Sequence, residues 1–487
     1  MTEANEVEPN PIGIRSSLYK PLVAADVDRV AEAAFEVLEK SGVAVYSDEA
    51  LGAFEKAGAN IDRAGRIVKL SRAMIEDAVA SNPSSITLHS RDGRTDVVLE
   101  ENRVHYSTGG TAIYVLDPDT GERRQSNVGD VILNARLVDV LEHIHAFTIN
   151  VFPHEIEDKH DIDVNRFFHA FDNTSKHVMG GIFSLEGSRK VVRMAETIAG
   201  GREALRARPF VSFITLIISP FKIDRDYGDM TCYFAQEGLP VVVPTEPIAG
   251  TTSPVTLAGN VLTHVAETLS GITLVQSVRR GAPGICGGVG SITDLRTMAH
   301  LAGPIERAMV NAAVAQMAQH FGIPMYSTAG TTDAKEVDAQ AVFETALSSQ
   351  LVAMSGANFI HDIAGLMESD LTVSYEKLVI DNEILGMIQR VLRGIEVNDT
   401  TLAADLMIEK GPGGDFMGER HTVRHMRKEF FFPKLANRHP RETSGPDDDA
   451  LARARAFVAE VRSSEPETCL PEEVRQVIRG TFPEILG

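Results

Sequence analysis

Residues 210–245 indicate the fold class most directly, with the sequence FVSFITLIISPFKIDRDYGDMTCYFAQEGLPVVVPT. Its two ends, residues 210–215 and 240–245, are short and almost continuously apolar. Between them, residues 226–238 place apolar side chains at helical spacing and stop at a glycine. Apolar strands joined by a helix are typical of a parallel sheet that is buried on both faces. The stretch therefore predicts a strand, a helix and a second, parallel strand.

The same alternation continues over residues 104–400. We predict eight strands, at residues 104–110, 146–152, 177–182, 210–215, 240–245, 284–287, 324–328 and 358–362, separated by amphipathic helices. Eight such units close naturally into a (β/α)8 TIM barrel. An open, doubly wound sheet is the alternative, but no GxGxxG or GxxxxGK(S/T) motif follows the first strand. The predicted fold class is therefore α/β, with a TIM barrel at its centre.

Two further regions flank the predicted barrel. Residues 1–103 mix helical spacing with short strand-like runs, which indicates an N-terminal α+β cap. Residues 401–487 read as a C-terminal helical extension, interrupted by the polar linker HPRETSGPDDD at residues 439–449. The chain is therefore predicted to consist of a cap, a barrel and a helical extension.

The composition excludes several classes of protein. Apolar residues make up 43% of the chain and charged residues 24%, which is average for a folded globular protein. The longest apolar stretch, residues 210–221, is far shorter than the roughly 20 residues that cross a bilayer. The start, MTEANEVEPNPIG, does not resemble a secretion signal, so we expect a cytoplasmic protein. A net charge of −21 opposes binding to nucleic acid and to anionic membranes.

The three cysteines, Cys232, Cys286 and Cys469, are far apart in the sequence. They form no CxxC pair and have no histidine at metal-ligand spacing, so neither a disulfide framework nor a zinc site is expected. No other metal site is predicted.

Polar residues at the carboxyl ends of the predicted strands are the candidates for chemistry, because barrel enzymes place their sites there. Glu246 ends an apolar strand, where an unpaired charge costs several kcal/mol, so it needs a partner or a cationic ligand. His361 and Asp362 end the eighth strand. Adjacent side chains of a regular strand point to opposite faces, so we expect only His361 to face the barrel mouth.

Other candidates lie at neighbouring strand ends. Phe152, Phe183 and Phe221 are candidates for an aromatic cage around a quaternary ammonium, although core packing is the ordinary role of phenylalanine. Ser327, Thr331 and Asp333 are candidate substrate-binding residues, with a plain helix N-cap as the alternative for Asp333. The candidate cofactor-binding positions, at glycines that allow a bulky ligand to approach, are Gly287, Gly288 and Gly330.

Three long segments resemble the trimethylamine methyltransferase family, the corrinoid-dependent enzymes that demethylate methylamines and betaines. The segments are TSPVTLAGNVLTHVAETLSGITLVQSVRRGAPGICGG (252–288), GIPMYSTAGTTDAKEVDAQAVFE (322–344) and GPGGDFMGERHTVRHMRKEFFFP (411–433). The resemblance follows the chain in order from about residue 10 to near its end. It implies a (β/α)8 barrel that presents a methylated amine to the cobalt corrinoid of a separate, cognate corrinoid protein, and a homo-oligomer.

The resemblance also bears on the substrate. Enzymes of this family that act on trimethylamine carry pyrrolysine in the loop after the seventh strand, which corresponds here to about residues 330–333. This chain has only standard residues there. The resemblance therefore implies methyl transfer from a quaternary amine such as glycine betaine or proline betaine to Co(I). From their places at the strand ends, we predict Glu246 and His361 as the catalytic residues.

Two other functions fit the same sequence features. The first is a non-catalytic, betaine-binding barrel that has kept the pocket and lost corrinoid docking. The second is a different TIM-barrel enzyme, a lyase or decarboxylase, with Glu246 or His361 as the general base.

Overall fold

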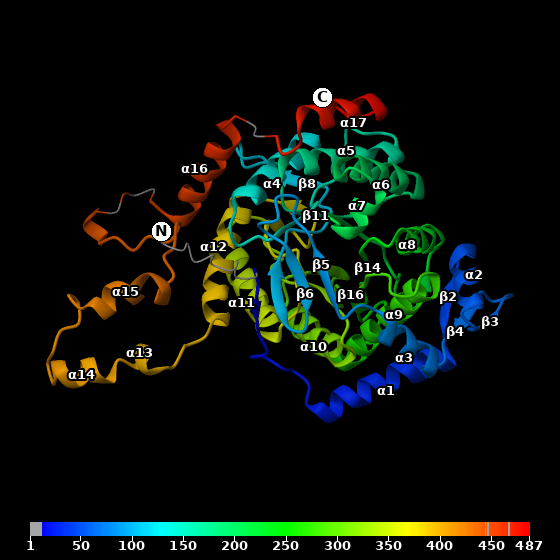
Figure 1. The fold of residues 1–487 in the computed structure, drawn as a ribbon, viewed down its shortest axis with the longest axis horizontal. Helices are drawn as coiled ribbons and strands as arrows, with labels where there is room; N and C mark the ends of the chain where they lie inside the picture. The colour runs from blue at the N-terminus through cyan, green and yellow to red at the C-terminus, as the bar shows by residue number, and fades with distance from the viewer. Residues whose placement is uncertain (1–11, 444, 446–447, 466–467) are drawn as a thin grey trace, which may run out of the picture.

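The structure is a computed structural model that describes residues 12–443, 445, 448–465 and 468–487. The acidic start of the chain and part of the 439–449 linker lie outside the described residues. Strands occupy the centre of the molecule and helices lie around them (Figure 1). No helix among the described residues is long and apolar enough to cross a membrane.

Nine strands form one central sheet in the order β1-β7-β20-β19-β16-β14-β12-β11-β10. Their bounds are β1 Ile14–Arg15, β7 Arg103–Tyr106, β10 Ala146–Thr148, β11 His177–Gly181, β12 Val211–Ile214, β14 Val241–Thr245, β16 Gly284–Gly288, β19 Met325–Thr328 and β20 Phe359–His361. β1 pairs with β7 in the antiparallel sense, and the other eight strands pair with one another in parallel. The eight predicted strands are confirmed, and each starts within one residue of its predicted start.

The two ends of the parallel set, β7 and β10, approach each other. Ser107, which follows β7, forms an isolated parallel bridge with Ala146, the first residue of β10. The backbone N–H of His145 also donates to the carbonyl of Tyr106 at 2.8 Å, and the hydroxyl of Ser107 donates to the carbonyl of Ala146 at 2.9 Å. The sheet therefore curls until its outer parallel strands share hydrogen bonds.

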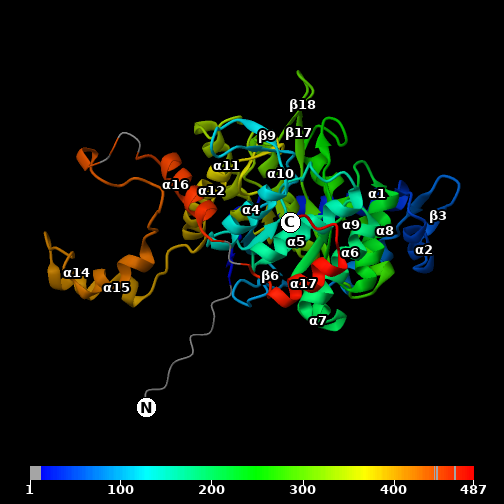
Figure 2. The same cartoon turned by 90° about the horizontal axis from the view of Figure 1, so that it is seen from above.

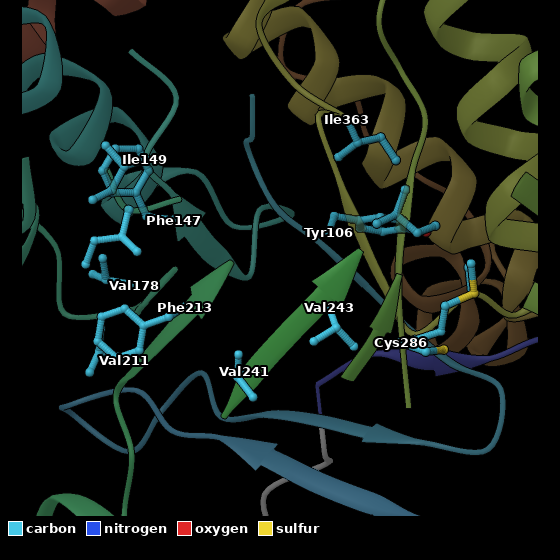
Figure 3. Close-up of a cluster of buried hydrophobic side chains, with 14 of the residues drawn as sticks. Tyr106, Phe147, Ile149, Val178, Val211, Phe213, Val241, Val243, Cys286 and Ile363 are labelled. Atoms are coloured by element: carbon cyan, nitrogen blue, oxygen red, sulfur yellow. The ribbon is translucent and has the colours of Figure 1, made fainter. Parts of the chain in front are cut away.

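Helices follow the strands and cover the outer face of the sheet. They are α4 Val128–Val140, α5 Lys159–Asn173, α6 Leu185–Ala199, α7 Arg202–Ala207, α8 Arg225–Glu237, α9 Leu257–Val278, α10 Ile305–Phe321, α11 Ala339–Ser355 and α12 Tyr375–Leu392. Side chains alternate between the two faces of each strand. Val241 and Val243 of β14 therefore belong to the large core shared with the helices (Figure 3), whereas Val242 belongs to a separate cluster on the inner face.

A β-hairpin closes the inner face at the amino ends of the strands. Its two strands are β5 Ser85–Leu88 and β6 Val97–Glu100. Leu88 and Leu99 of the hairpin pack against Val242, Tyr326 and Phe359 from the inner face of the sheet. This end of the sheet is filled with apolar side chains, which leaves the carboxyl ends of the strands as the place for polar groups.

Two small sheets stand at the carboxyl ends of the central strands. One contains β15 Ile248–Ala249, β17 Ser291–Asp294 and β18 Ala299–Leu301, and the other contains β21 Leu366–Met367, β22 Thr372–Val373, β8 Tyr114–Leu116 and β9 Arg123–Gln125. The hairpin of β17 and β18 projects beyond the body (Figure 2). These additions to the basic strand–helix repeat build the surroundings of the strand ends.

The flanking regions pack in different ways. The helices α1 Ala24–Lys40, α2 Asp48–Lys56 and α3 Arg72–Ser81 pack on α9, next to a small sheet of β2 Val43–Val45, β3 Asn60–Asp62, β4 Ile67–Lys69 and β13 Lys222–Ile223. After α12, the chain forms α13 Asp399–Leu402, α14 Ala404–Lys410, α15 Arg420–Glu429, the short 3-10 helix Arg441–Thr443, α16 Ala450–Ser463 and α17 Glu472–Thr481. α16 and α17 pack on the body, whereas α13 to α15 lie away from it (Figures 1 and 2).

Truncating the buried hairpin residue in the substitution Leu88→Ala is expected to destabilise the chain by about 2–5 kcal/mol, because it leaves a cavity against the inner face of the sheet. Urea denaturation followed by circular dichroism measures the effect. Leu18→Ala, at a side chain that is 61% exposed, is the matched control and should leave the midpoint nearly unchanged. Equal midpoints for both variants would contradict the assignment of the hairpin to the core.

Candidate functional site

The guanidinium of Arg307 lies at the centre of a polar cluster at the carboxyl ends of the strands. Arg307 is the third residue of α10, and its side chain is only 3% exposed. Its Nε donates to the carbonyl of Gly290 at 2.7 Å, and its Nη1 donates to the carbonyl of Ala302 and to Oγ1 of Thr331. Its Nη2 donates to Oδ2 of Asp370 at 3.3 Å. These acceptors fix the guanidinium in one position.

Four carboxylates lie close enough to this guanidinium to affect its pKa. Burial alone would lower the pKa of Arg307, but the negative charges outweigh it and the pKa is raised; the carboxylates are Asp370, Asp362, Glu246 and Asp333. Only one of the four, Asp370, lies within ion-pair distance of Arg307. The cluster therefore carries more carboxylates than the single arginine can neutralise.

Glu246 follows β14 directly, where the sequence predicted a carboxylate that needs a partner. Its Oε1 accepts a hydrogen bond from the hydroxyl of Ser291 in β17, at 3.1 Å. Burial raises the pKa of Glu246, and the nearby charge of Asp370 raises it further against the opposing effect of Arg307. Burial also opposes ionisation of Asp370, yet Arg307 and then His300 hold the pKa of Asp370 below its ordinary value. Of these two carboxyl groups, Glu246 is the one that holds a proton more readily.

His361 and Asp362 form a second part of the cluster. The Nδ1 of His361 lies 2.6 Å from the carbonyl of Ser327, which only accepts, so this nitrogen carries a hydrogen. The Nε2 lies 2.8 Å from Oδ2 of Asp362, and Thr328 donates its hydroxyl to the same oxygen. The imidazole also stacks on Tyr326 with a centroid distance of 3.8 Å. This arrangement holds the edge of the imidazole beside the carboxylate of Asp362.

The two side chains meet because the strand ends early. β20 stops at His361, and Asp362 takes a left-handed backbone conformation with φ of +61°. The expectation that only one of the two would face the strand ends assumed a regular strand through residue 362. That expectation was wrong, because the turn at Asp362 swings its carboxylate back onto His361.

The aromatic candidates divide into two groups. Phe152 and Phe183 form an edge-to-face pair with ring centroids 5.6 Å apart. The buried guanidinium of Arg166 lies 5.1 Å from the centroid of Phe183, so a cation already occupies one face of that ring. Among the described residues, no ring contact joins Phe221 to this pair. The three phenylalanines are therefore not one preformed cage.

A buried glutamate holds Phe221 in place. Glu267, on α9, accepts from the backbone N–H of Phe221 at 2.8 Å and from the hydroxyl of Ser219 at 2.7 Å. The hydroxyl of Thr245, at the end of β14, also donates to Glu267. Phe221 itself has a left-handed φ of +50° after the cis peptide bond between Ser219 and Pro220. Burial raises the pKa of Glu267 to about 7.

Close packing accounts for the three candidate glycines. A Cβ at Gly287 would come within 2.5 Å of Pro244, and one at Gly288 would come within 3.0 Å of Val314 on α10. Gly330 has φ of +81°, and a Cβ there would lie 2.6 Å from the backbone of Ile363. Gly287 and Gly330 therefore need glycine for contacts within the protein, and Gly288 is closely packed, whatever approaches from outside.

The remaining candidates lie around Arg307 and His361. Thr331 accepts from Arg307, and Ser327 contributes its carbonyl oxygen to His361. Asp333 accepts from the backbone N–H of Ala302 at 2.9 Å and from the hydroxyl of Ser369 at 2.6 Å. The helix-cap alternative for Asp333 is excluded, because Asp338 is the N-cap of α11.

The structure thus brings Glu246, Ser327, Thr331, Asp333 and His361 into one connected cluster. It leaves the aromatic candidates and the glycines beside that cluster. Among the described residues, no group of three or more His, Cys, Asp or Glu side chains is arranged to hold a metal ion.

Sequence reasoning missed three members of the site. Arg307, Asp370 and Glu267 come from helices and a loop and not from strand ends. A signal was present for Glu267, which is the only charged residue in the 22-residue helix α9. Asp370 gave no comparable signal.

The substitution Glu267→Gln should change how stability depends on pH. Between the ordinary value of 4.5 and about 7, the folded chain holds a proton on Glu267 that the unfolded chain has released, so the wild type loses stability as pH rises through this window. Glutamine has no proton to lose. The free energy of unfolding of the variant minus that of the wild type should therefore be larger at pH 8 than at pH 4, by on the order of 3 kcal/mol. Denaturant unfolding at both pH values measures this, and a difference that stays constant with pH would contradict it.

The chain is 35% identical to the trimethylamine methyltransferase MttB of Desulfitobacterium hafniense, over 92% of this chain and 90% of that protein. It is 29% identical to the glycine betaine methyltransferase of another strain of that species, over 87% of this chain and 88% of that protein. Among solved structures, it matches the monomethylamine methyltransferase of Methanosarcina barkeri with a TM-score of 0.48 and 15% identity, over 97% of this chain and 95% of that chain.

The relatives named methyltransferases match along most of their length, so the chain is an enzyme of the same kind. The family model described as trimethylamine methyltransferase matches residues 2–482, which is nearly the whole sequence. This chain therefore belongs to the trimethylamine methyltransferase (MTTB) family of methyltransferases.

Proposed function

We propose that this enzyme transfers a methyl group from a quaternary amine, such as glycine betaine or proline betaine, to the Co(I) corrinoid of a partner corrinoid protein. The excess of carboxylates over cations around Arg307 is the observation that carries the choice of a cationic substrate. Glu246, Asp370, Asp362 and Asp333 all act on one guanidinium. A site with surplus negative charge and few water-exposed groups attracts and holds a cation.

We further infer that the central sheet is a closed (β/α)8 barrel. The bridge between Ser107 and Ala146 supports this, since it joins the first and second strands of the parallel set. In a closed barrel all eight carboxyl ends face one mouth, and residues there read as functional. The Arg307 cluster then lies in the mouth, opposite the apolar hairpin that fills the other end.

The chemistry of the leaving group favours a quaternary amine. When a methyl group leaves a quaternary nitrogen, that nitrogen keeps the electron pair of the broken C–N bond and departs as a neutral tertiary amine without any proton transfer. A free tertiary amine is a poorer leaving group and needs activation. Residues 330–333 are Gly, Thr, Thr and Asp, and the three side chains bond within the protein, so they offer no activating group.

The chain's own part in this reaction is to bind and orient the substrate. A corrinoid supplies a Co(I) nucleophile when its carrier protein is docked. Glu246 lies at the carboxyl end of β14, and part of its surface is accessible. Its negative charge would hold the ammonium while one methyl group stays exposed to the mouth. Holding the methyl group in line with the nucleophile is a proximity and orientation effect, and such effects can lower an activation barrier substantially.

The surroundings of the cluster fit a docked protein. β15 and β17 lie beside Glu246, and a cleft of about 410 Å³ opens along the β17–β18 hairpin. Val255, Leu295 and Met298 expose more than half of their surface there. Exposed apolar side chains next to a polar site are typical of a surface that another protein covers.

We also propose that the enzyme works in the cytoplasm as a homo-oligomer. All three cysteines are free thiols, as is usual in a reducing compartment. The self-association expected from the family resemblance finds support in an exposed apolar segment, which is described in the next subsection.

The direct test is methyl transfer by the full-length enzyme. The enzyme is incubated with its cognate corrinoid protein, or with free cobalamin reduced to Co(I), and with glycine betaine, proline betaine, carnitine, choline or trimethylamine. We expect the absorbance of methylcobalamin to appear with at least one quaternary amine and not with trimethylamine. Transfer from trimethylamine alone would refute the substrate class, and no transfer from any compound would refute the proposed reaction.

Removing the charge in Glu246→Gln is expected to lower kcat/KM for the quaternary amine by roughly 10–100-fold, the effect of losing one charge-assisted contact. Burial raises the pKa of Glu246, so binding of the cation should strengthen as pH rises through that raised value and the carboxylate forms. The variant should lose this pH dependence when affinity is measured by calorimetry. Glu336→Gln, at an exposed carboxylate outside the cluster, is the control, and an equal loss in both variants would contradict the assigned role.

A further inference from the structure

Residues 394–428 form an arm that leaves the body and returns to the place where it left. α12 ends at Leu392, and Arg393 contacts the carbonyl of Lys428 at the return. The side chain of Lys428 also lies 3.3 Å from Glu396. Figures 1 and 2 show α13 to α15 well outside the body in both views. The arm is therefore an excursion whose two ends are clamped side by side.

The arm has no core of its own. Its helices α13, α14 and α15 have 4, 7 and 10 residues, and none contains a buried residue. Isolated helices shorter than about 12–15 residues are marginal in water. A Lys410–Glu419 ion pair and a bond from His421 to the carbonyl of Thr400 tie the arm together, but surface contacts of this kind contribute little. The helices of the arm therefore need a partner surface to become stable.

The arm exposes an unusual amount of apolar surface. Of the 28 exposed large apolar residues in the described chain, nine lie in the arm. Five are between 67% and 86% exposed, namely Ile395, Val397, Ile408, Met417 and Val423. With about 200 Å² for a large side chain, the nine together present on the order of 1,000 Å². That sum reaches the roughly 800 Å² that each partner of a stable interface buries.

The charge of the returning part of the arm points to an acidic partner. Residues 420–428 contain four Arg or Lys residues and no acidic residue, whereas residues 394–419 contain six acidic residues and one lysine, and the whole chain has a net charge of −21. Opposite charges guide association and set its orientation. A second copy of this chain is therefore an electrostatically suitable partner.

The body of the same chain carries a matching apolar face on α11. Val342, Phe343 and Leu347 are 41%, 53% and 57% exposed. Glu344 is the only charged residue of the helix, and it accepts from the backbone N–H of Asp333, on the protein side. An exposed helix face without any charge is unusual for a surface helix. In Figures 1 and 2 the arm points away from α11 of its own chain, so the arm does not cover this face within one copy.

We propose that the arm of one copy docks on the α11 face of a second copy, and that this contact holds the homo-oligomer together. The inference rests on the self-association proposed above and names its surface, and it does not depend on methyl transfer. The occupant is a second copy because the chain itself supplies both an uncovered apolar arm whose last part, residues 420–428, is basic and an uncovered apolar face on an acidic body.

Analytical ultracentrifugation of the full-length protein tests the contact. The wild type is expected to sediment as a multiple of its 52.9 kDa chain. Replacing residues 398–426 by a short Gly/Ser linker, which the adjacent arm ends permit, should give a monomer. The pairs Met417→Glu with Val423→Glu on the arm, and Phe343→Glu with Leu347→Glu on α11, should each weaken association on the order of 100-fold.

Mixing the variants distinguishes arm-to-face docking from arm-to-arm docking. The linker variant keeps its α11 face, and the Phe343→Glu, Leu347→Glu variant keeps its arm. If the arm of one copy binds the face of another, the two together should form a one-to-one complex although neither associates alone. A mixture that stays monomeric would overturn the proposed pairing.

Val477→Glu is the matched control, because this residue on α17 is 56% exposed and lies outside both surfaces. It should leave the mass unchanged, and circular dichroism should show all variants folded. A wild type that is monomeric at every concentration would refute both self-association and this surface. An oligomer that survives the linker replacement would refute this surface alone. Methyl transfer is assayed separately, so failure of the proposed reaction would leave these sedimentation results standing.

Discussion

The buried guanidinium of Arg307 is the constraint on which the candidate site depends. A charge removed from water needs partners on every side, and Arg307 finds them in two carbonyl groups, one hydroxyl and the carboxylate of Asp370. These partners come from the loops after β16, β18, β19 and β21, so one side chain ties several loops to a single point. The surplus carboxylates around it give the strand ends their negative character.

The fold separates apolar and polar chemistry along the strands. At the amino ends, the β5–β6 hairpin and the inner-face residues Val242 and Phe359 form a dry cluster. At the carboxyl ends, the same alternation of side chains presents Glu246 and His361. The inner surface of one sheet therefore contributes to stability at one end and to binding at the other. This division is common among enzymes that place their sites at strand carboxyl ends.

The body and the arm also differ in how they bury apolar side chains. The body buries its apolar residues in one large core and two smaller clusters, whereas the arm of residues 394–428 buries none in its helices. A segment of this kind lowers its free energy only by covering another surface. The basic residues are confined to residues 420–428, the last part of the arm, and this uneven charge gives the contact with an acidic body a preferred orientation.

Much of the architecture could be predicted from the sequence because strand signals are local. Eight apolar runs gave eight strands, and the residue after 245 was correctly identified as a carboxylate at a strand end. The family was equally evident from segments that resemble it along the whole chain.

The tertiary structure was needed to show which side chains contact one another. Arg307 and Asp370 meet Glu246 from distant positions, Asp362 turns back onto His361 through one left-handed residue, and Arg166 occupies a face of Phe183. Contacts between residues far apart in the chain depend on how helices and loops pack. Periodicity along the sequence is a local property and does not predict that packing.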